Sequence, residues 1–204
     1  MPPTRARRRQ SPEETRSLIL DSAEAVLRER PFREISVDEV MQPTGYRRTV
    51  FYRHFTGLPD LVVAVLSRVL PALAEANERF REVAGQQLGE DDVRPVIRSV
   101  VEHWQRHGPL MLALRDAGVY DAQIDALIDA TQERFIGLLA DVLAERQGAG
   151  WSGGSDPRQL AAALTSMNQR YLLHCFGGRE ARATVDEATD ALTAVWAAVI
   201  TRAS

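Results

Sequence analysis

Residues 45–55 read Gly-Tyr-Arg-Arg-Thr-Val-Phe-Tyr-Arg-His-Phe, and this stretch decides the fold. It contains three arginines and no acidic residue. Its two phenylalanines, Phe51 and Phe55, are four residues apart, so in a helix they lie on one face. Just before it, residues 36–39 (Ser-Val-Asp-Glu) form a capping box that opens a short helix, and residues 43–45 (Pro-Thr-Gly) predict a tight turn. The stretch therefore predicts two short helices joined by a turn, with an apolar back and a basic front.

The rest of the chain repeats the helical period and shows no sustained strand-like alternation. Ser11 followed by Pro12 predicts the start of the first helix, and Pro31 predicts its end. A long apolar-periodic segment covers residues 58–83, and Pro71 is expected to kink or interrupt it. Further helices are expected near residues 92–107, 109–117, 122–146, 156–176 and 184–202. The predicted fold class is all-α, with about nine helices.

The charge of the chain is divided unevenly along its length. The whole sequence has a formal net charge of -3. Residues 1–60 hold 11 Arg against 9 acidic residues, whereas residues 61–204 hold 14 Arg against 19 acidic residues. The basic side chains of the first part include two acid-free clusters, at residues 5–9 and 47–53. A basic segment in an acidic chain is typical of a protein that binds nucleic acid through one end.

Composition and length narrow the class of protein further. A chain of 204 residues with 45% hydrophobic side chains can bury a core without a disulfide or a metal ion. The single Cys175 cannot form an internal disulfide, the N-terminus has no secretory signal, and no apolar run reaches membrane-spanning length. We therefore expect a cytoplasmic protein with no membrane partner.

A helix-turn-helix binds DNA because its second helix lays its exposed face in the major groove, which is wide enough for one α-helix. The apolar back of this unit is expected to consist of Val37, Val40, Phe51 and Phe55. The side chains expected to contact DNA are polar and lie on or beside the second helix: Ser36, Arg47, Arg48, Thr49, Tyr52, Arg53 and His54. The alternative for residues 36–55 is an ordinary helical hairpin without a DNA role.

Two interpretations of the arginine cluster at residues 5–9 stay open. The cluster is too polar to pack in a core, so one interpretation is a solvated tail. The other is a disordered arm in which Arg8 adds a phosphate or minor-groove contact.

From residue 104 onward, large apolar and aromatic side chains recur at helical spacing. Each of them taken singly is best explained as core. As a set they can line a cavity, because small-molecule sites are mostly apolar with a few placed polar groups, here Thr165 and Asn168 one turn apart. The candidate ligand-binding residues are Trp104, Met111, Leu114, Phe135, Leu139, Thr165, Asn168, Tyr171 and Trp196. The expected ligand is a small apolar or amphipathic molecule.

The last two predicted helices are also candidates for an interface. Residues 160–176 and 188–200 are apolar enough to bury one face inward and another against a second copy of the chain. Such a pair from each copy forms a four-helix bundle. We therefore expect a homodimer.

No set of residues points to catalysis or to a cofactor. His103 and His107 are four residues apart, as helical metal ligands can be, but a zinc site needs at least three protein ligands and no companion group is evident. Cys175 beside His174 lacks a third group to orient it, so we interpret Cys175 as a buried small side chain. We expect no metal site, no cofactor and no enzyme activity. Two alternatives stay open: a helical small-molecule-binding protein or enzyme without a DNA role, and a module whose basic face binds an acidic protein.

The N-terminal third of the sequence resembles the TetR family of bacterial transcriptional regulators. The resemblance lies in residues 35–40 (Ile-Ser-Val-Asp-Glu-Val), in Gly45, in residues 51–55 (Phe-Tyr-Arg-His-Phe), and in the long apolar helix that follows. A second, narrower resemblance joins residues 160–176 to the eighth helix of EthR-type regulators. The family resemblance implies an all-α homodimer with an N-terminal three-helix DNA-binding domain and a C-terminal domain that binds a variable inducer.

The resemblance also assigns roles to positions of this sequence. Asn168 matches a pocket asparagine, Trp196 matches a pocket tryptophan, and Thr165 replaces a second asparagine. Three positions depart from the family pattern. Met41 stands where a small residue is usual, Arg47 where a Ser or Thr helix cap is usual, and Leu58 where a Lys is usual.

Together these observations predict the organisation and the function. We expect a basic arm at residues 1–10, a helix-turn-helix domain at 11–57, and a helical ligand-binding and dimerisation domain at 58–204. The predicted function is a ligand-responsive repressor, which binds a near-palindromic DNA operator as a homodimer and is released by a small-molecule inducer.

Overall fold

The computed structural model describes residues 11–84, 90–148 and 156–200. Within these ranges every regular element is a helix and none is a strand, which confirms the predicted all-α fold class. Arg8 and the rest of the predicted arm lie outside the described residues. Within the same ranges, no helix combines the length and apolar composition needed to cross a lipid bilayer.

Eight α-helices and two short 3₁₀-helices make up the described part of the chain. Their bounds, in chain order, are α1 Pro12–Glu29, η1 Phe32–Glu34, α2 Val37–Met41, η2 Gln42–Thr44, α3 Arg48–Phe51, α4 Leu58–Ala84, α5 Glu90–Tyr120, α6 Ala122–Gly148, α7 Pro157–Phe176 and α8 Val185–Ile200.

Side-chain caps explain where several of these helices begin. Ser11 and Ser36 each accept a hydrogen bond from the backbone N–H three residues on. The glutamate at that position in turn accepts a hydrogen bond from the backbone N–H of the serine. Thr184 and Glu187 make the same reciprocal pair ahead of α8. Asp156 accepts from the N–H of Gln159 at the start of α7. These bonds satisfy backbone donors that have no partner inside the helix.

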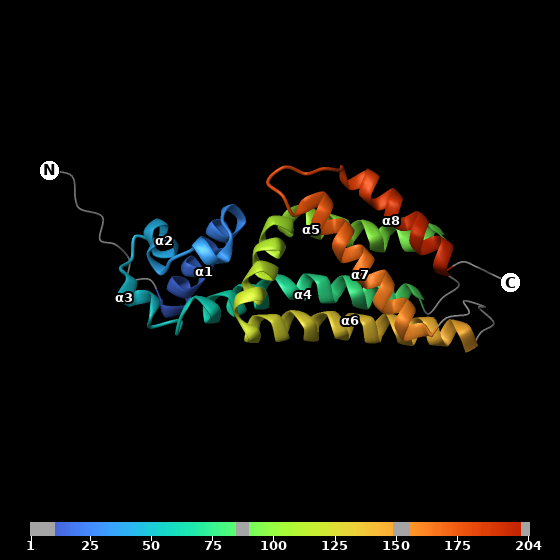
Figure 1. Ribbon diagram of the computed structural model, residues 1–204, viewed down its shortest axis with the longest axis horizontal. Helices are drawn as coiled ribbons and strands as arrows, with labels where there is room; N and C mark the ends of the chain where they lie inside the picture. Colours follow the sequence, from blue (N-terminus) through green and yellow to red (C-terminus); the bar gives the residue numbers. More distant parts are fainter. Residues whose placement is uncertain (1–10, 85–89, 149–155, 201–204) are drawn as a thin grey trace.

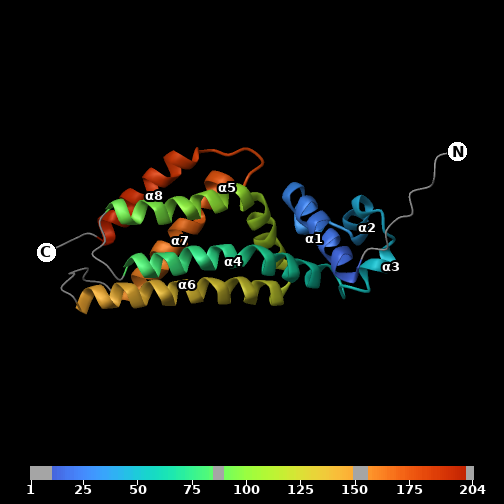
Figure 2. The same ribbon diagram turned by 180° about the vertical axis from the view of Figure 1, so that it is seen from behind.

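The molecule is elongated, with a small cluster of helices at one end (Figures 1 and 2). Helices α1, α2 and α3 form this cluster, and α4 runs from it along the long axis of the molecule beside α6. Helix α8 lies along α5, and α7 crosses between these helices and α6. The first described helix, α1, belongs to this cluster, whereas α8 ends at the opposite end of the molecule (Figure 1).

Two hydrophobic cores hold these parts together. The first contains the apolar faces of α1 to α4 and also includes Leu110, Leu114 and Ala117 from the end of α5. The second joins the first half of α5 to α6, α7 and α8 and is centred on residues such as Leu143 and Trp196. Because α4 and α5 both contribute to the first core, the helical cluster packs firmly against the rest of the chain.

Helix α5 is longer than the sequence predicted. The segments expected as two helices, 92–107 and 109–117, form one helix that passes through Pro109 and bends there (Figure 1). Gly108 permits the end of α7 to pack closely against α5 here, because a Cβ at this position would lie 2.1 Å from the backbone oxygen of Phe176. Merging these two segments gives eight α-helices in the described residues, where nine were predicted. Likewise, α4 is not interrupted at Pro71.

The recognition segment is the opposite case, because its helix is shorter than predicted. The prediction was a helix over residues 47–54, but α3 covers only Arg48–Phe51. Tyr52 is the C-cap of α3, and the N–H groups of His54 and Phe55 both bond back to the carbonyl of Phe51. This tight ending lets the chain reverse into α4 within a few residues.

Candidate DNA-binding and ligand-binding sites

The turn between α2 and α3 is fixed by local bonds. Gly45 adopts the left-handed conformation with φ of 70°, which costs an L-residue with a side chain roughly 1–2 kcal/mol. The hydroxyl of buried Thr44 donates to the carbonyl of Met41 at 2.6 Å and accepts from the N–H of Tyr46 at 3.1 Å. The angle between α2 and α3 is therefore set before any ligand binds.

The two sides of α3 differ sharply in exposure. On its inner side Phe51 is fully buried and Phe55 is 3% exposed, and Val37 and Val40 of α2 are buried with them. On its outer side the side chains predicted to contact DNA are exposed, with His54 half-buried: Ser36, Arg47, Arg48, Thr49, Tyr52, Arg53 and His54. This arrangement has the exposed polar front and apolar back that a groove-binding helix needs.

Arg48 is held in place on this outer face. Its guanidinium donates to the hydroxyl of Tyr52 at 2.9 Å and to a carboxylate oxygen of Asp38 at 3.4 Å, and it lies over the Tyr52 ring. The hydrogen bond with Tyr52 and the nearby Asp38 charge raise the pKa of Arg48, so it stays charged. An ordered arginine loses less conformational entropy on binding than a freely rotating one.

The three departures from the family pattern have clear structural positions. Met41 is 2% exposed and packs in the first core. Arg47 is the N-cap of α3 and makes no side-chain capping bond. Leu58 packs half-buried against the first core, whereas a lysine at this position could reach out to a phosphate.

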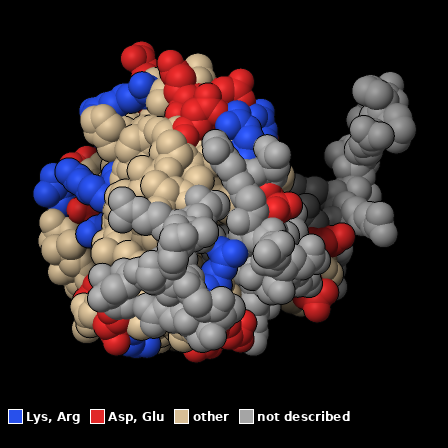
Figure 3. Space-filling model, turned by 90° about the vertical axis from the view of Figure 1, so that its right-hand side faces the viewer, with Lys and Arg blue, Asp and Glu red and all other residues tan. Residues whose placement is uncertain are grey.

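A basic surface is not repeated at the opposite end of the molecule. Viewed from that end, positive and negative side chains are interspersed over the part of the face that the structure describes (Figure 3). Ion pairs between α5 and α8, such as Arg94 with Asp190 at 2.6 Å, contribute to this mixed surface. The arginines of the α3 face are therefore the better candidate for a contact with a polyanion.

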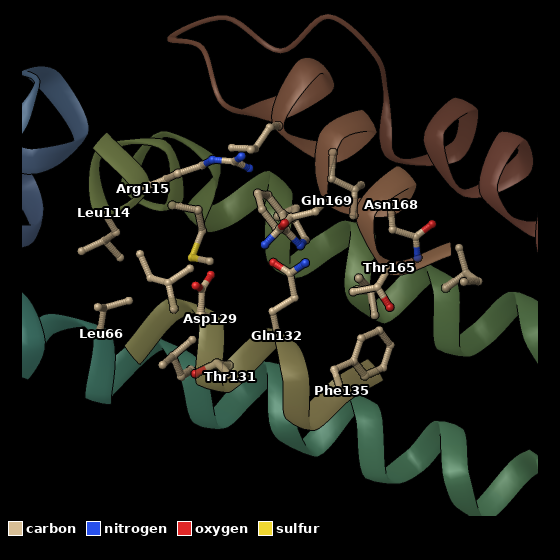
Figure 4. A pocket seen from close by; sticks show the side chains of 18 of the residues that line it. Leu66, Leu114, Arg115, Asp129, Thr131, Gln132, Phe135, Thr165, Asn168 and Gln169 are labelled. Carbon is tan, nitrogen blue, oxygen red and sulfur yellow. The ribbon is translucent and has the colours of Figure 1, made fainter. Parts of the chain in front are cut away.

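An apolar cavity of about 230 Å³ lies inside the larger helical part (Figure 4). Helices α4, α5, α6, α7 and α8 all contribute to its walls. Leu66 and Leu70 come from α4, and aromatic side chains come from α5, α6 and α8. The buried side chain of Trp104 and the fully enclosed Trp196 make this wall strongly apolar.

The structure brings seven of the nine sequence-predicted ligand residues together around this cavity. They come from four different helices: Trp104, Met111, Leu114, Phe135, Thr165, Asn168 and Trp196. Leu139 and Tyr171 do not line it. Leu139 is fully buried in the second core one turn beyond Phe135, and Tyr171 packs against that core and bonds to Cys175. Cys175 itself is buried and unpaired by any disulfide.

Two polar side chains of the cavity wall are almost completely buried. Trp196 donates its ring N–H to the amide oxygen of Asn168 at 3.0 Å, which fixes the orientation of that amide. Thr165 is 7% exposed, and its hydroxyl has no hydrogen-bond partner in the described residues. A buried hydroxyl without a partner is costly, so this one is a ready site for a polar group of a bound molecule.

Sequence reasoning missed eight apolar residues of the cavity wall and also a group of polar ones. Arg115 of α5, Asp125, Asp129 and Gln132 of α6, and Gln169 of α7 line one side of the cavity. Arg115 and both aspartates are exposed, so along the sequence they look like ordinary solvated helix faces. Only the bend in α5 brings Arg115 opposite α6, and no local pattern carries that information.

The pair His103 and His107 lies outside this cavity wall. Their rings are 4.7 Å apart, and burial lowers the pKa of His103 to about 4, so its imidazole is neutral. His107 also has a lowered pKa, chiefly from burial and secondly from the charge of Arg28 in α1, which lies 3.4 Å away. Among the described residues no group of three His, Cys, Asp or Glu side chains is arranged to hold a metal ion.

The helix-turn-helix has a buried apolar back and an exposed basic front, and the helical body behind it holds an internal cavity. Together these features define the class of protein, a DNA-binding transcriptional regulator. The comparisons with known proteins make this more specific. Residues 93–201, more than half of the chain, match the family described as "Transcriptional regulator EthR, C-terminal domain". The chain belongs to the EthR-type branch of the TetR family.

Curated relatives and solved structures agree with this assignment. The HTH-type transcriptional regulator EthR of Mycobacterium tuberculosis is 26% identical over 197 residues, covering 96% of this chain and 91% of that protein. A TetR-like regulator from Rhodococcus sp. RHA1 has the same fold, with a TM-score of 0.71, 20% identity, and coverage of 95% of this chain and 100% of that one. A TetR-family regulator from Streptomyces coelicolor also gives a TM-score of 0.71, at 22% identity over 93% of this chain and 82% of that one.

Proposed function

We propose that this regulator is a repressor that binds a near-palindromic operator as a homodimer and is released by a small amphipathic ligand. Residues 11–57 are the DNA-binding unit and residues 58–204 bind the ligand and the second subunit. The proposed ligand site is the cavity, with Thr165 and Asn168 as its buried polar groups. The proposed DNA contacts are the exposed side chains around α3, with Arg48 and Tyr52 at their centre.

The observation that carries this proposal is the position of α4. This helix begins at Leu58, directly after the recognition segment, and its buried residues Leu61 and Val65 pack in the first core with α1. Leu66, the next residue, and Leu70, one turn further on, line the cavity. A molecule that shifts α4 from inside the cavity therefore also shifts the unit that carries α3.

The coupling needs only a modest energy difference. A ligand that prefers one arrangement of α4 by ~1–3 kcal/mol changes DNA affinity by about 5- to 150-fold. In a dimer both recognition helices must fit successive major grooves about 34 Å apart, so a small rotation of each unit is enough to weaken binding.

The proposed dimer interface is the outer face of α8 together with the neighbouring face of α7. The inward face of α8 is buried through Leu192 and Trp196. After Asp190, the exposed side chains of its outward face are small and uncharged: Ala191, Ala194, Val195 and Ala198. Such a face packs closely against its own copy across a twofold axis.

The DNA part of the proposal is tested by fluorescence anisotropy with the duplex upstream of the protein's own gene. Binding that involves six to ten phosphates falls roughly 10³- to 10⁵-fold between 50 and 200 mM salt. Replacing Arg48 by Ala is expected to weaken binding about tenfold or more at fixed salt. Because Arg48 is exposed, the melting temperature stays unchanged.

Arg134→Ala is the matched control, since Arg134 is an exposed arginine on α6. It removes the same charge without touching α3. Equal affinity of the Arg48→Ala and Arg134→Ala variants would remove α3 from the DNA interface, and absence of any binding at low salt would refute the DNA role.

A further inference from the structure

The wall of the cavity is divided into an apolar interior and a charged mouth. In the interior, Ile97, Trp104, Leu172 and Trp196 are all buried. At the mouth, Asp129 and Gln132 rise from α6 toward Gln169 of α7, and Arg115 extends along the opposite edge (Figure 4). A molecule that fills the interior therefore places one end among charged side chains.

Acidic groups outnumber basic ones at this mouth. Asp125 and Asp129 both line it, and Arg115 is the single cation among the described lining residues. In the described part of the chain, neither carboxylate is joined to a basic side chain by an ion pair. Asp125 also packs against the end of α5, where its carboxylate oxygen is 3.4 Å from the position of a Cβ on Gly118. The mouth therefore carries a net negative charge that is not neutralised locally.

We propose that the ligand of this cavity is a cationic amphiphile, with a protonated amine held at the Asp125–Asp129 mouth and an apolar body in the interior. This inference rests on the proposed function, since it specifies the ligand of the same cavity. An alkylammonium group donates its three N–H bonds to the two carboxylates and to the amide oxygen of Gln132 or Gln169. An anionic head group would be attracted by the charge of Arg115 but repelled by the charges of both carboxylates, so its binding is disfavoured.

A second observation marks this cavity as a binding site independently of the acidic pair. Thr165 is more than nine-tenths buried, and its unpartnered hydroxyl belongs to the interior wall. Thr189 and Thr193 also bury hydroxyls without a partner, but of these three hydroxyls only that of Thr165 lines the cavity, where a bound molecule can satisfy it. The Thr165 hydroxyl and the charged mouth together suit a molecule with a polar head group and one further hydrogen-bonding group along its apolar body.

Three probes with the same tail and different heads test the charge preference. Octylamine, octanol and octanoate are titrated into the full-length protein, and binding is followed by calorimetry and by the fluorescence of the cavity tryptophans. The expected order of affinity is octylamine, then octanol, then octanoate, with about three- to tenfold between successive probes. Octanoate binding as tightly as octylamine, or binding of none of the three, would overturn the proposal.

Charge-removing variants assign the preference to the mouth. Asp129→Asn is expected to weaken octylamine about three- to tenfold and to leave octanol within about twofold. Arg115→Gln is expected to strengthen octylamine and to weaken octanoate further. Asp141→Asn is the control, because Asp141 is an exposed carboxylate of the same helix that does not line the cavity. An equal effect of Asp129→Asn and Asp141→Asn on octylamine would show only a general charge effect and overturn the assignment.

The DNA titration is made separately, without octyl compounds. A protein that fails to bind DNA refutes the proposed function, while the order of the three probes still decides the charge of the ligand. Conversely, a protein that binds DNA but shows no preference among the probes keeps the proposed function and loses this inference.

Discussion

The imidazole ring of His103 is 3% exposed and lies one helical turn before His107 in α5. Desolvation holds its pKa near 4, and the positive charges of Arg106 and of a protonated His107 act in the same direction. Its ring nitrogen Nε2 has no hydrogen-bond partner among the described residues. The folded protein therefore excludes a proton that the unfolded chain accepts.

The resulting prediction concerns stability below neutral pH. Above pH 6.5 the ring is neutral in both states and contributes no pH dependence. Between pH 6.5 and about 4 the unfolded chain binds the proton, so stability is lost as the pH falls, by at most about 3 kcal/mol. Urea unfolding at pH 7 and pH 5 measures this loss. His103→Leu is expected to reduce the difference in stability between the two pH values, and an unchanged difference would assign the loss to another group, such as His107.

Single residues also show what sequence can and cannot reveal about the cavity. Trp104, Phe135 and Trp196 were predicted because large apolar side chains at helical spacing must face inward somewhere. The same spacing also selected Leu139, which faces inward but one turn too far along α6 to reach the cavity. Asp129 was missed because its exposure and charge are those of a surface residue. Helical periodicity separates inside from outside, and it does not separate core from cavity.

Helix α5 shows a similar limit at the scale of elements. Two helices were predicted, over residues 92–107 and 109–117, yet the structure has one helix that continues through Pro109. The capping serine followed by proline at residues 11–12 and the capping box at Ser36, by contrast, predicted the starts of α1 and α2 from sequence alone. Local bonds set helix starts, whereas packing against α7 decides whether residues 108–109 end a helix or bend it.

Two glycine substitutions test the close approach of α5 to the end of α7 at residue 108. Gly108→Ala is expected to destabilise the fold by about 1–3 kcal/mol, because the new methyl group would lie 2.1 Å from the backbone oxygen of Phe176. Gly137→Ala in α6 is the control, since nothing lies within 4 Å of a Cβ there. It is expected to stabilise by roughly 0.5–1 kcal/mol because alanine favours a helix interior. Urea midpoints that move in the same direction for both variants would contradict the close approach of α5 and α7.

Over the whole molecule, the DNA-binding cluster and the body contact each other at several points besides α4. Arg28 of α1 lies 3.4 Å from the ring of His107 in α5. Arg179, in the segment between α7 and α8, donates to the backbone carbonyl of Glu29 at 3.1 Å. These polar contacts join the C-terminal end of α1 to α5 at His107 and to the segment that follows α7. A change in the cavity walls therefore has several routes to α1, and the position of the cluster depends on the body as a unit.

A bulky side chain inside the cavity tests whether this unit responds to what the cavity holds. Thr165→Trp occupies the interior, so octylamine affinity is expected to fall about tenfold or more, since the site has little room beyond 230 Å³. Operator affinity without octylamine stays within about threefold, and release of DNA by octylamine is lost. Ala130→Trp places the same bulk on the exposed side of α6 and retains the response. Anisotropy titrations of operator DNA with and without octylamine measure both effects. A Thr165→Trp protein that still releases DNA as the unmodified chain does would mean that the signal starts outside this cavity, because no molecule of that size fits beside the new indole.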